Sequence, residues 1–264
     1  MARPPYPLLL LGAAGATWPV WLWYVPASLD ASNDYIGLFA AASVLALLWR
    51  ARGVQPSAAP SHALALPLAC MLAYTAATLA GWSIALRAVP AMLALATLAS
   101  SWRLGRRLDL PLTALALMAL PFAATLQFYL GYPLRAFTGT LAAALLQLNG
   151  LAVVREGAML AWNGTLVAID APCSGVKMLW AGLYLALALA AVQGLNARRS
   201  ALALALAAIV LVLANAMRAA ALFYVETGLI ALPGWAHQGA GLVSFVLAAL
   251  VLLYAMQAMK GARP

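Results

Sequence analysis

Residues 201–225 read ALALALAAIVLVLANAMRAAALFYV, an apolar run that contains a single charged residue, Arg218. A run of this length predicts a transmembrane helix, because crossing a bilayer takes about 20 apolar residues. Similar runs recur along the chain, at about 7–26, 35–49, 63–81, 86–102, 109–130, 174–193, 201–225 and 236–258. The sequence therefore predicts an all-α polytopic membrane protein with about eight transmembrane helices.

The overall composition excludes a soluble protein. Of the 264 residues, 66% are hydrophobic and 8% are charged, whereas a soluble domain carries about 25% charged residues. The net charge of +9 does not indicate a nucleic-acid partner, because the basic residues are scattered between apolar runs and form no basic module. We expect membrane lipids as surroundings and one transmembrane domain over 1–264, with four N-terminal spans in 1–108 and a core in 109–258.

The charges between the apolar runs predict an orientation. If both termini are cytoplasmic, ten of the fifteen Lys and Arg residues lie on the cytoplasmic side and five of the six acidic residues lie outside. This bias follows the positive-inside rule. Together with a composition rich in Ala, Leu and Arg, it predicts a multi-pass protein of a bacterial inner membrane with both ends in the cytoplasm.

The longest region between two spans is 131–172, on the predicted outer side. Its first half, 134–148, has the pattern of a helix that lies along or dips into the outer leaflet. In its second half, apolar stretches at 159–162 and 165–169 flank Asn163-Gly164, a dipeptide that favours a tight hairpin turn. We predict a small extracytoplasmic hairpin directly before the sixth span.

Cys173 follows this hairpin, in the segment Asp170-Ala171-Pro172-Cys173-Ser174-Gly175. Proline and serine here are typical of a helix start, and a helix N-terminus stabilises an anion. Lys177, one turn later, adds a positive charge. Both effects lower the pKa of a thiol, and the thiolate is the nucleophilic form. The alternative interpretation is a small apolar side chain at a helix start, the kind of role predicted for Cys70 in the third span.

Two further polar residues stand out near the predicted outer side. Arg218 lies about 25 Å along its helix, and Asn215 precedes it by three residues on the same helical face. An arginine inside a span usually faces a polar cavity or a partner, with snorkelling to the headgroups as the alternative. His237 opens the last span, where its imidazole either is simply solvated or serves general acid–base chemistry. His62 lies in a cytoplasmic loop without such a setting.

The three helix placements bring Cys173, Arg218 and His237 to a similar depth at one membrane face. A thiol, a guanidinium and an imidazole at one depth predict a cysteine-dependent acyl-transfer site. The two cysteines and two histidines are too dispersed to supply the four ligands of a structural zinc ion. We therefore expect neither a metal nor another cofactor.

The pattern resembles the exosortase/archaeosortase family of membrane-embedded cysteine transpeptidases. Residues 172–175, Pro-Cys-Ser-Gly, are similar to the family's nucleophile motif, and residues 215–218, Asn-Ala-Met-Arg, to its arginine motif. His237, Gly241 and Phe245 are similar to its histidine motif. The resemblance covers about residues 110–258, and Lys177 stands where many relatives carry arginine. It implies that Cys173, Arg218 and His237 are catalytic. Supporting or substrate-binding roles are assigned to Asp170, Ser174, Gly175, Lys177 and Asn215.

The resemblance also implies a substrate class. Family members process secreted proteins whose C-terminal sorting signal has a short motif, often Pro-Glu-Pro, then one transmembrane helix and a basic cluster. Cleavage near the motif at the outer face, through a thioester, would transfer the new C-terminus to an acceptor. Three alternatives stay open: hydrolysis at the same site, a transporter or channel with a polar vestibule, and a non-catalytic assembly or lipid-binding protein.

Overall fold

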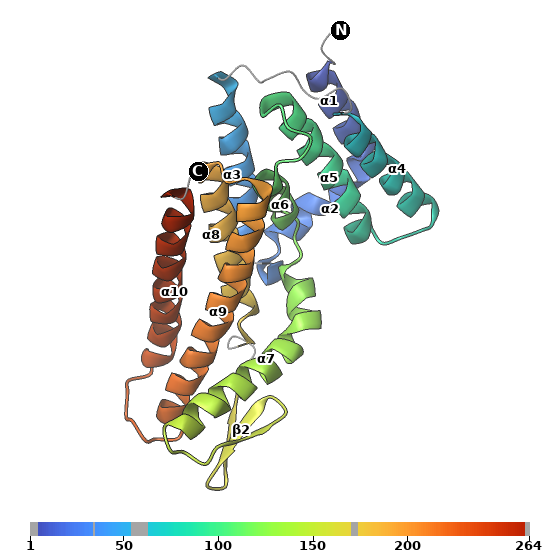
Figure 1. The fold of residues 1–264 in the computed structure, drawn as a ribbon. Helices are drawn as coiled ribbons and strands as arrows, with labels where there is room; N and C mark the ends of the chain where they lie inside the picture. The colour runs from blue at the N-terminus through green and yellow to red at the C-terminus, as the bar shows by residue number, and fades with distance from the viewer. Residues whose placement is uncertain (1–4, 34, 54–62, 170–173, 262–264) are drawn as a thin grey trace. The chain divides into compact units, whose positions relative to one another are not determined.

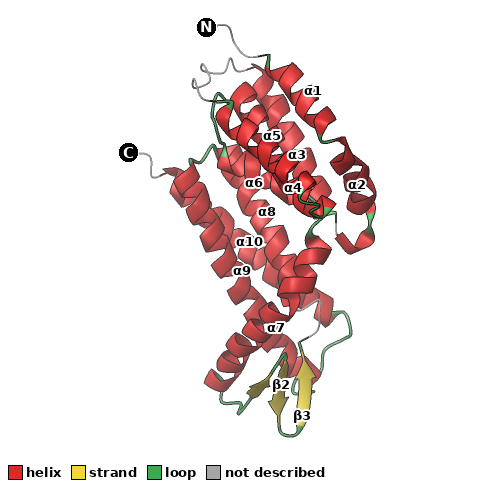
Figure 2. Cartoon of the chain, turned by 90° about the vertical axis from the view of Figure 1, so that its right-hand side faces the viewer, coloured by secondary structure: helices red, strands yellow, loops and turns green. Residues whose placement is uncertain are grey.

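The computed structural model describes residues 5–33, 35–53, 63–169 and 174–261. It divides into two compact units: unit 1 comprises residues 1–122 and 190–200, and unit 2 comprises 123–189 and 201–264. Figure 1 and Figure 2 show helices throughout and one small sheet. The helices are α1 (Tyr6–Ala16), α2 (Trp18–Leu29), α3 (Ile36–Arg50), α4 (Ala65–Leu79), α5 (Ile84–Arg103), α6 (Leu110–Met118), α7 (Ala123–Leu148), α8 (Val176–Gln193), α9 (Ala197–Glu226) and α10 (Ala236–Gly261), with short 3₁₀ turns η1 (Ala31–Asn33) and η2 (Ala51–Gly53).

The helix lengths support a polytopic membrane protein. Within the described residues, α5, α8, α9 and α10 are each long and apolar enough to cross a membrane. The number of candidate spans rises to six if α1 with α2, and α6 with α7, each form one broken span. Helices α3 and α4 have 15 residues each, which is shorter than the roughly 20 residues of a full span. The number of eight transmembrane spans therefore stays a prediction.

Two of the predicted spans are interrupted. The run 7–26 is divided at Thr17, where α1 and α2 meet at 74°. The run 109–130 is divided at 119–122, and the second helix, α7, continues through Pro133 to Leu148. The prediction of one helix ending near 130 and a separate one from 134 was therefore wrong. The chain breaks beside Pro121 instead, whereas Pro133 is accommodated inside α7, because an internal proline is tolerated when other groups satisfy the freed backbone.

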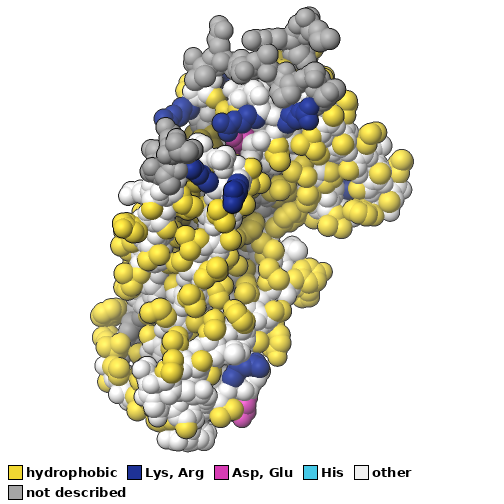
Figure 3. Space-filling model, in the orientation of Figure 1, with side chains coloured by type: hydrophobic (Ala, Val, Ile, Leu, Met, Phe, Trp, Pro, Cys, Tyr) yellow, Lys and Arg dark blue, Asp and Glu magenta, His cyan; other side chains and the backbone are white. Residues whose placement is uncertain are grey.

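Unit 1 packs its helices through small side chains. Ala88 and Ala91 of α5 are fully buried beside Val20 and Tyr74, and small residues let helix backbones approach closely. Two of its basic residues, Arg50 and Arg103, lie in the last turns of α3 and α5. Figure 3 shows Lys and Arg side chains gathered at this end of the unit and hydrophobic side chains along its flank.

Unit 2 contains the sheet, which has the order β1 (Val154–Glu156), β2 (Met159–Trp162) and β3 (Thr165–Ala168). Strands β2 and β3 pair antiparallel with Trp162 opposite Thr165. Asn163 and Gly164 between them have φ of 48° and 77°, and two positive φ values define the type I′ turn that matches strand twist. The sequence predicted the two strands beside this turn, and the structure adds β1.

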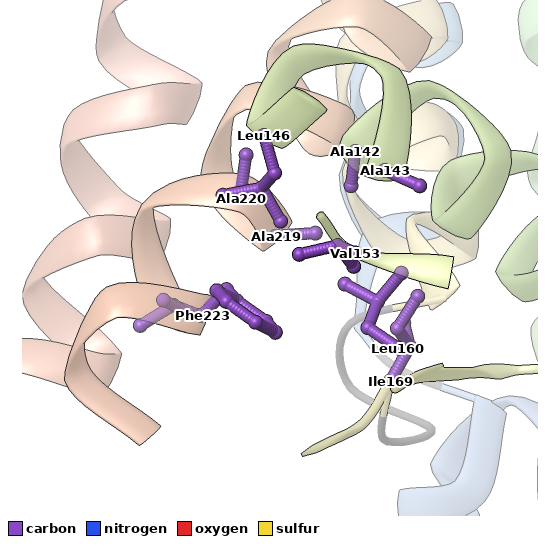
Figure 4. Close-up of a cluster of buried hydrophobic side chains, with 10 residues drawn as sticks. Ala142, Ala143, Leu146, Val153, Leu160, Ile169, Ala219, Ala220 and Phe223 are labelled. Atoms are coloured by element: carbon purple, nitrogen blue, oxygen red, sulfur yellow. The ribbon is translucent and has the colours of Figure 1, made fainter. Parts of the chain in front are cut away.

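A buried cluster holds this sheet between α7 and α9. Leu146 of α7, Leu160 of β2 and Phe223 of α9 are at most 1% exposed, and Figure 4 shows them directed toward one another. The rings of Trp162 and Phe223 meet edge to face with centroids 6.1 Å apart. At the end of β3, Ile169 is 5% exposed. The strand that precedes the Asp170–Gly175 segment is therefore fixed to the helices of unit 2.

Candidate functional site

The start of α8 is built around Ser174. Asp170 and Cys173, the supporting acid and the nucleophile of the sequence prediction, lie outside the described residues, whereas Ser174 is described and 2% exposed. Its hydroxyl accepts a hydrogen bond from the backbone N–H of Val176 (3.4 Å) and donates one to Oε1 of Gln127 on α7 (3.3 Å). The first contact is a local bond from a serine hydroxyl to the N–H two residues later, at the residue where α8 begins. The second ties this helix start to α7.

Gly175 lies against Asn215 of α9. Its φ is +82°, a conformation that L side chains rarely adopt. A Cβ at this position would lie 2.7 Å from Nδ2 and 2.9 Å from Cγ of Asn215. The Asn215 side chain is buried, and its Nδ2 donates to Oγ1 of Thr138 on α7 at 3.0 Å. A residue of the predicted nucleophile motif therefore contacts a residue of the predicted arginine motif.

A small cavity adjoins this contact. Its volume is about 10 Å³, which is close to the least that admits one water molecule. It is lined by Leu134, Thr138, Ser174, Gly175, Leu179, Leu211, Val212 and Asn215. The helices α7, α8 and α9 are thus closely packed here, and the polar atoms of Ser174, Thr138 and Asn215 lie around a space of water size.

Arg218 lies one turn beyond Asn215 on α9, and its guanidinium packs against Gly241 of α10. A Cβ on residue 241 would lie 3.2 Å from both Cζ and one terminal nitrogen of Arg218. Among the residues that the structure describes, the buried Nε of Arg218 has no hydrogen-bond partner. A buried guanidinium N–H without a partner is costly.

His237 pairs with Glu226 across the connection between α9 and α10. Its Nδ1 is 3.6 Å from Oε1 of Glu226. The two side chains are 37% and 52% exposed, so this end of the site is open to solvent. Gly241 follows His237 by one helical turn, about 6 Å along the axis of α10. The Arg218 guanidinium, which packs against Gly241, is therefore placed one turn of α10 away from the residue that carries the imidazole.

Glu226 and His237 close one end of a groove of about 200 Å³. The groove runs along β3 and the facing turns of α9. Its other lining residues are Leu160, Thr165, Leu166, Val167, Ala168, Ile169, Ala219, Leu222 and Phe223. Most of the lining side chains are apolar, but polar atoms contribute as much of the exposed wall as apolar atoms do. A concave site that combines apolar side chains with convergent polar groups is the usual form of a ligand site.

Sequence reasoning foresaw some members of this site and missed others. Asn215, Arg218 and His237 were singled out, and Lys177 is exposed on the first turn of α8. The partners Gln127, Thr138 and Glu226 were not foreseen. Glu226 was counted only as an outer acid, although its position at the end of the helix that carries Arg218 was a usable signal. The partners on α7 are far away in sequence and carry no comparable signal.

The other cysteine of the chain belongs to the other unit. Cys70 is buried in α4 of unit 1, where it packs as a small apolar side chain. In the described ranges, no three His, Cys, Asp or Glu side chains are grouped closely enough to hold a metal ion.

Comparison with known proteins gives one match. The family model described as transmembrane exosortase (Exosortase_EpsH) matches residues 23–254, a range that contains every site residue from Gln127 to Gly241. No curated protein and no solved structure matches the chain significantly. Because the match extends over most of the sequence, from α2 to α10, the chain belongs to the transmembrane exosortase family.

Proposed function

We propose that this protein is a cysteine transpeptidase that cleaves C-terminal sorting signals of secreted proteins and transfers the new C-terminus to an acceptor. Membership of the exosortase family supports a transmembrane enzyme that processes sorting signals. The nucleophile is Cys173, with Arg218 and His237 as its catalytic partners. Ser174, Gly175 and Asn215 position these groups, and Asp170 and Lys177 contribute charge beside the nucleophile.

One observation supports this assignment most strongly: two close approaches connect the three motifs. Gly175 lies against Asn215, and Arg218 lies against Gly241. Neither approach leaves room for a larger residue without movement. The motifs are dispersed over almost 70 residues of sequence, from 175 to 241, so their contact arises from the fold of unit 2. A site assembled from several elements is the arrangement expected for catalysis.

The first chemical step forms a thioester. The Cys173 thiol gives its proton to His237, and the sulfur attacks the carbonyl carbon of the scissile peptide bond. Arg218 donates hydrogen bonds to the oxyanion that develops, an effect of about 2.7–4 kcal/mol for one donor in comparable sites. The C–N bond then breaks, and His237 returns the proton to the departing amine. Glu226, 3.6 Å from Nδ1, stabilises the imidazolium in between.

The second step resolves the thioester. The acceptor nucleophile loses its proton to His237 and attacks the same carbonyl carbon, and Arg218 again stabilises the oxyanion. The C–S bond then breaks, and His237 gives the proton to the departing sulfur, which restores the Cys173 thiol. If water is the nucleophile, the same sequence of events is hydrolysis. The substrates in this proposal carry a Pro-Glu-Pro-like motif, one transmembrane helix and a basic cluster. The site faces the outer side of a bacterial inner membrane, with both termini cytoplasmic.

Processing of a co-expressed substrate tests the nucleophile. A secreted reporter with a sorting signal is produced with the wild type, with Cys173→Ala and with Cys70→Ala, and the reporter mass is measured. We expect the wild type and Cys70→Ala to shorten the reporter and Cys173→Ala to leave it intact at equal membrane abundance. Cleavage by Cys173→Ala would refute the proposal. The mass of the new C-terminus separates transfer, which adds the acceptor, from hydrolysis, which adds water.

A further inference from the structure

Strand β3 has an open edge. In the described part of unit 2, the sheet order β1-β2-β3 gives β3 only one neighbour. The two-residue turn at Asn163-Gly164 makes Trp162 and Thr165 a hydrogen-bonded pair. The N–H of Ile169 donates to the Ala158 carbonyl at 2.9 Å, so residue 169, an even number of residues further on, is also a hydrogen-bonded position. Because bonding alternates along an antiparallel pair, residues 165 and 167 bond to β2, and residue 169 bonds to Ala158 just before β2. The backbone groups of Leu166 and Ala168 therefore point away from the sheet.

The groove follows this open edge. It is lined by five consecutive residues, 165–169, but by only Leu160 from β2, so it extends along the strand rather than across the sheet. Leu166 is 57% exposed and Phe223 and Leu222 of α9 form the facing wall. The proposed catalytic base, His237, lies at one end. The edge, the wall and the base therefore belong to one continuous site.

The chemistry of this edge identifies its occupant as an extended peptide. The N–H and C=O groups of Leu166 and Ala168 recur every second residue, about 6.8 Å apart, a spacing that matches the backbone of another strand. Adding a strand to an exposed edge is a recurrent mode of peptide recognition. A volume of about 200 Å³ is below the roughly 300–1,000 Å³ of drug-sized ligand sites, and it suits a few residues of one chain.

We infer that the substrate's signal segment binds as a fourth strand on the open edge of β3, between this edge and α9. The backbone of Leu166 and Ala168 aligns the peptide, and the groove directs it toward His237. Because hydrogen bonding alternates along a strand pair, every second residue of the bound peptide presents its backbone N–H and C=O to β3. The residues between them make no such bond, so they tolerate the loss of the backbone N–H. Recognition thus acts partly through the backbone. This inference rests on the proposed function for the identity of the peptide.

Proline substitutions test the edge with little effect on the ladder. Leu166→Pro removes only the outward N–H, since proline is tolerated on an edge strand where its nitrogen faces away from the partner. Leu166→Ala removes the same side chain but keeps the N–H. Arg155 occupies the corresponding position on β1, the other edge strand. It pairs with Leu160, and because the backbone groups of Leu160 bond to β3, the backbone N–H of Arg155 points away from the sheet. Arg155→Pro, compared with Arg155→Ala, is therefore the matched control for placing proline in this sheet.

Reporter processing is measured for all four variants and for Cys173→Ala, with thermal unfolding of each purified protein. We expect Leu166→Pro to process up to about tenfold more slowly than Leu166→Ala, which is the upper end of the effect of one lost hydrogen bond. Arg155→Pro and Arg155→Ala should process alike. Equal rates for the two Leu166 variants, while Cys173→Ala is inactive, would overturn the edge inference and leave the proposed function standing.

Photo-crosslinking gives a readout that does not need turnover. A benzophenone amino acid replaces Leu166 in the Cys173→Ala protein, and the tagged reporter is co-expressed. A covalent adduct between the protein and the signal segment of the reporter supports the inference, even if the wild type proves not to cleave. Adducts only with a second copy of this chain, or no adduct with the signal segment, would overturn it.

Discussion

Gly175 and Asn215 are in such close contact that a single methyl group on residue 175 would lie 2.7 Å from Nδ2 of Asn215. Gly175 lies in the turn that precedes α8, and Asn215 lies on α9. The Asn215 side chain also donates a hydrogen bond to Thr138 of α7. Three elements therefore converge on one amide side chain. Arg218 lies one turn away from this amide on α9.

Gly175→Ala should impair processing strongly. Its φ of +82° costs an alanine about 1–2 kcal/mol, and the new Cβ would displace Asn215. Since an ångström of misplacement lowers catalysis by up to about a hundredfold, we expect a tenfold to hundredfold loss of reporter cleavage. Gly194→Ala is the matched control, because Gly194 has φ of +65° and a methyl group there would meet no atom within 4 Å. Equal losses for both variants would show that strain alone is responsible.

Gly241→Ala should separate stability from activity. Alanine is better than glycine inside a helix by about 0.5–1 kcal/mol, but a methyl here would lie 3.2 Å from the Arg218 guanidinium and push it aside. We expect an unchanged or higher unfolding temperature together with slower processing. Gly239→Ala, whose methyl would meet only the Trp235 ring at 3.5 Å, should gain stability and keep activity. Full activity of Gly241→Ala would mean that the position of Arg218 is not critical.

Glu226→Gln should lower the processing rate without affecting folding. The neutral amide is close in shape to the carboxylate but no longer stabilises a positive charge on His237, 3.6 Å away. A roughly tenfold slower cleavage is expected, less than the ~10²–10⁴-fold contribution of a general acid–base group, because His237 itself is still present. Glu156→Gln, which alters an exposed acid on β1, serves as the control. If the two variants cleave equally fast, Glu226 has no role in positioning His237.

Phe223→Ala should loosen the sheet from α9. The side chain is fully buried in the cluster that joins α7, β2 and α9, and removing such a ring typically costs about 3–5 kcal/mol. We expect a lower unfolding temperature and faster proteolysis within residues 154–168. Leu213→Ala, on an exposed position of the same helix, should change neither. A protected sheet in Phe223→Ala would show that other contacts hold it.

The sequence was sufficient to predict elements that depend on local pattern. The apolar run 201–225 became most of α9, and Asn163-Gly164 lies at a turn between two strands. Helix interruption was harder, because Pro121 and Pro133 look alike in sequence but only Pro121 lies at a break. Which proline interrupts a helix depends on the groups that satisfy the freed carbonyl.

Contacts between distant segments were beyond sequence reasoning. Asn215 and Arg218 share a helical face, which spacing alone reveals. The contact of Arg218 with Gly241 depends on how α9 packs against α10. The hydrogen bond between Ser174 and Gln127 depends on how α7 packs beside the start of α8. No pattern within either segment records the other. The groove beside β3 is likewise a product of packing, since its lining comes from both the sheet and α9.

The openness of the His237–Glu226 pair bears on the fate of the acyl intermediate. With these side chains 37% and 52% exposed, bulk water has access to the base that would activate the acceptor. Under the proposed function, the ratio of ligated to hydrolysed product is then a kinetic partition between two competing nucleophiles. An acceptor confined to the membrane surface gains effective concentration without tighter binding. Product distribution should therefore follow the surface density of the acceptor, so that dilution of the acceptor in the bilayer turns the ligase into a hydrolase.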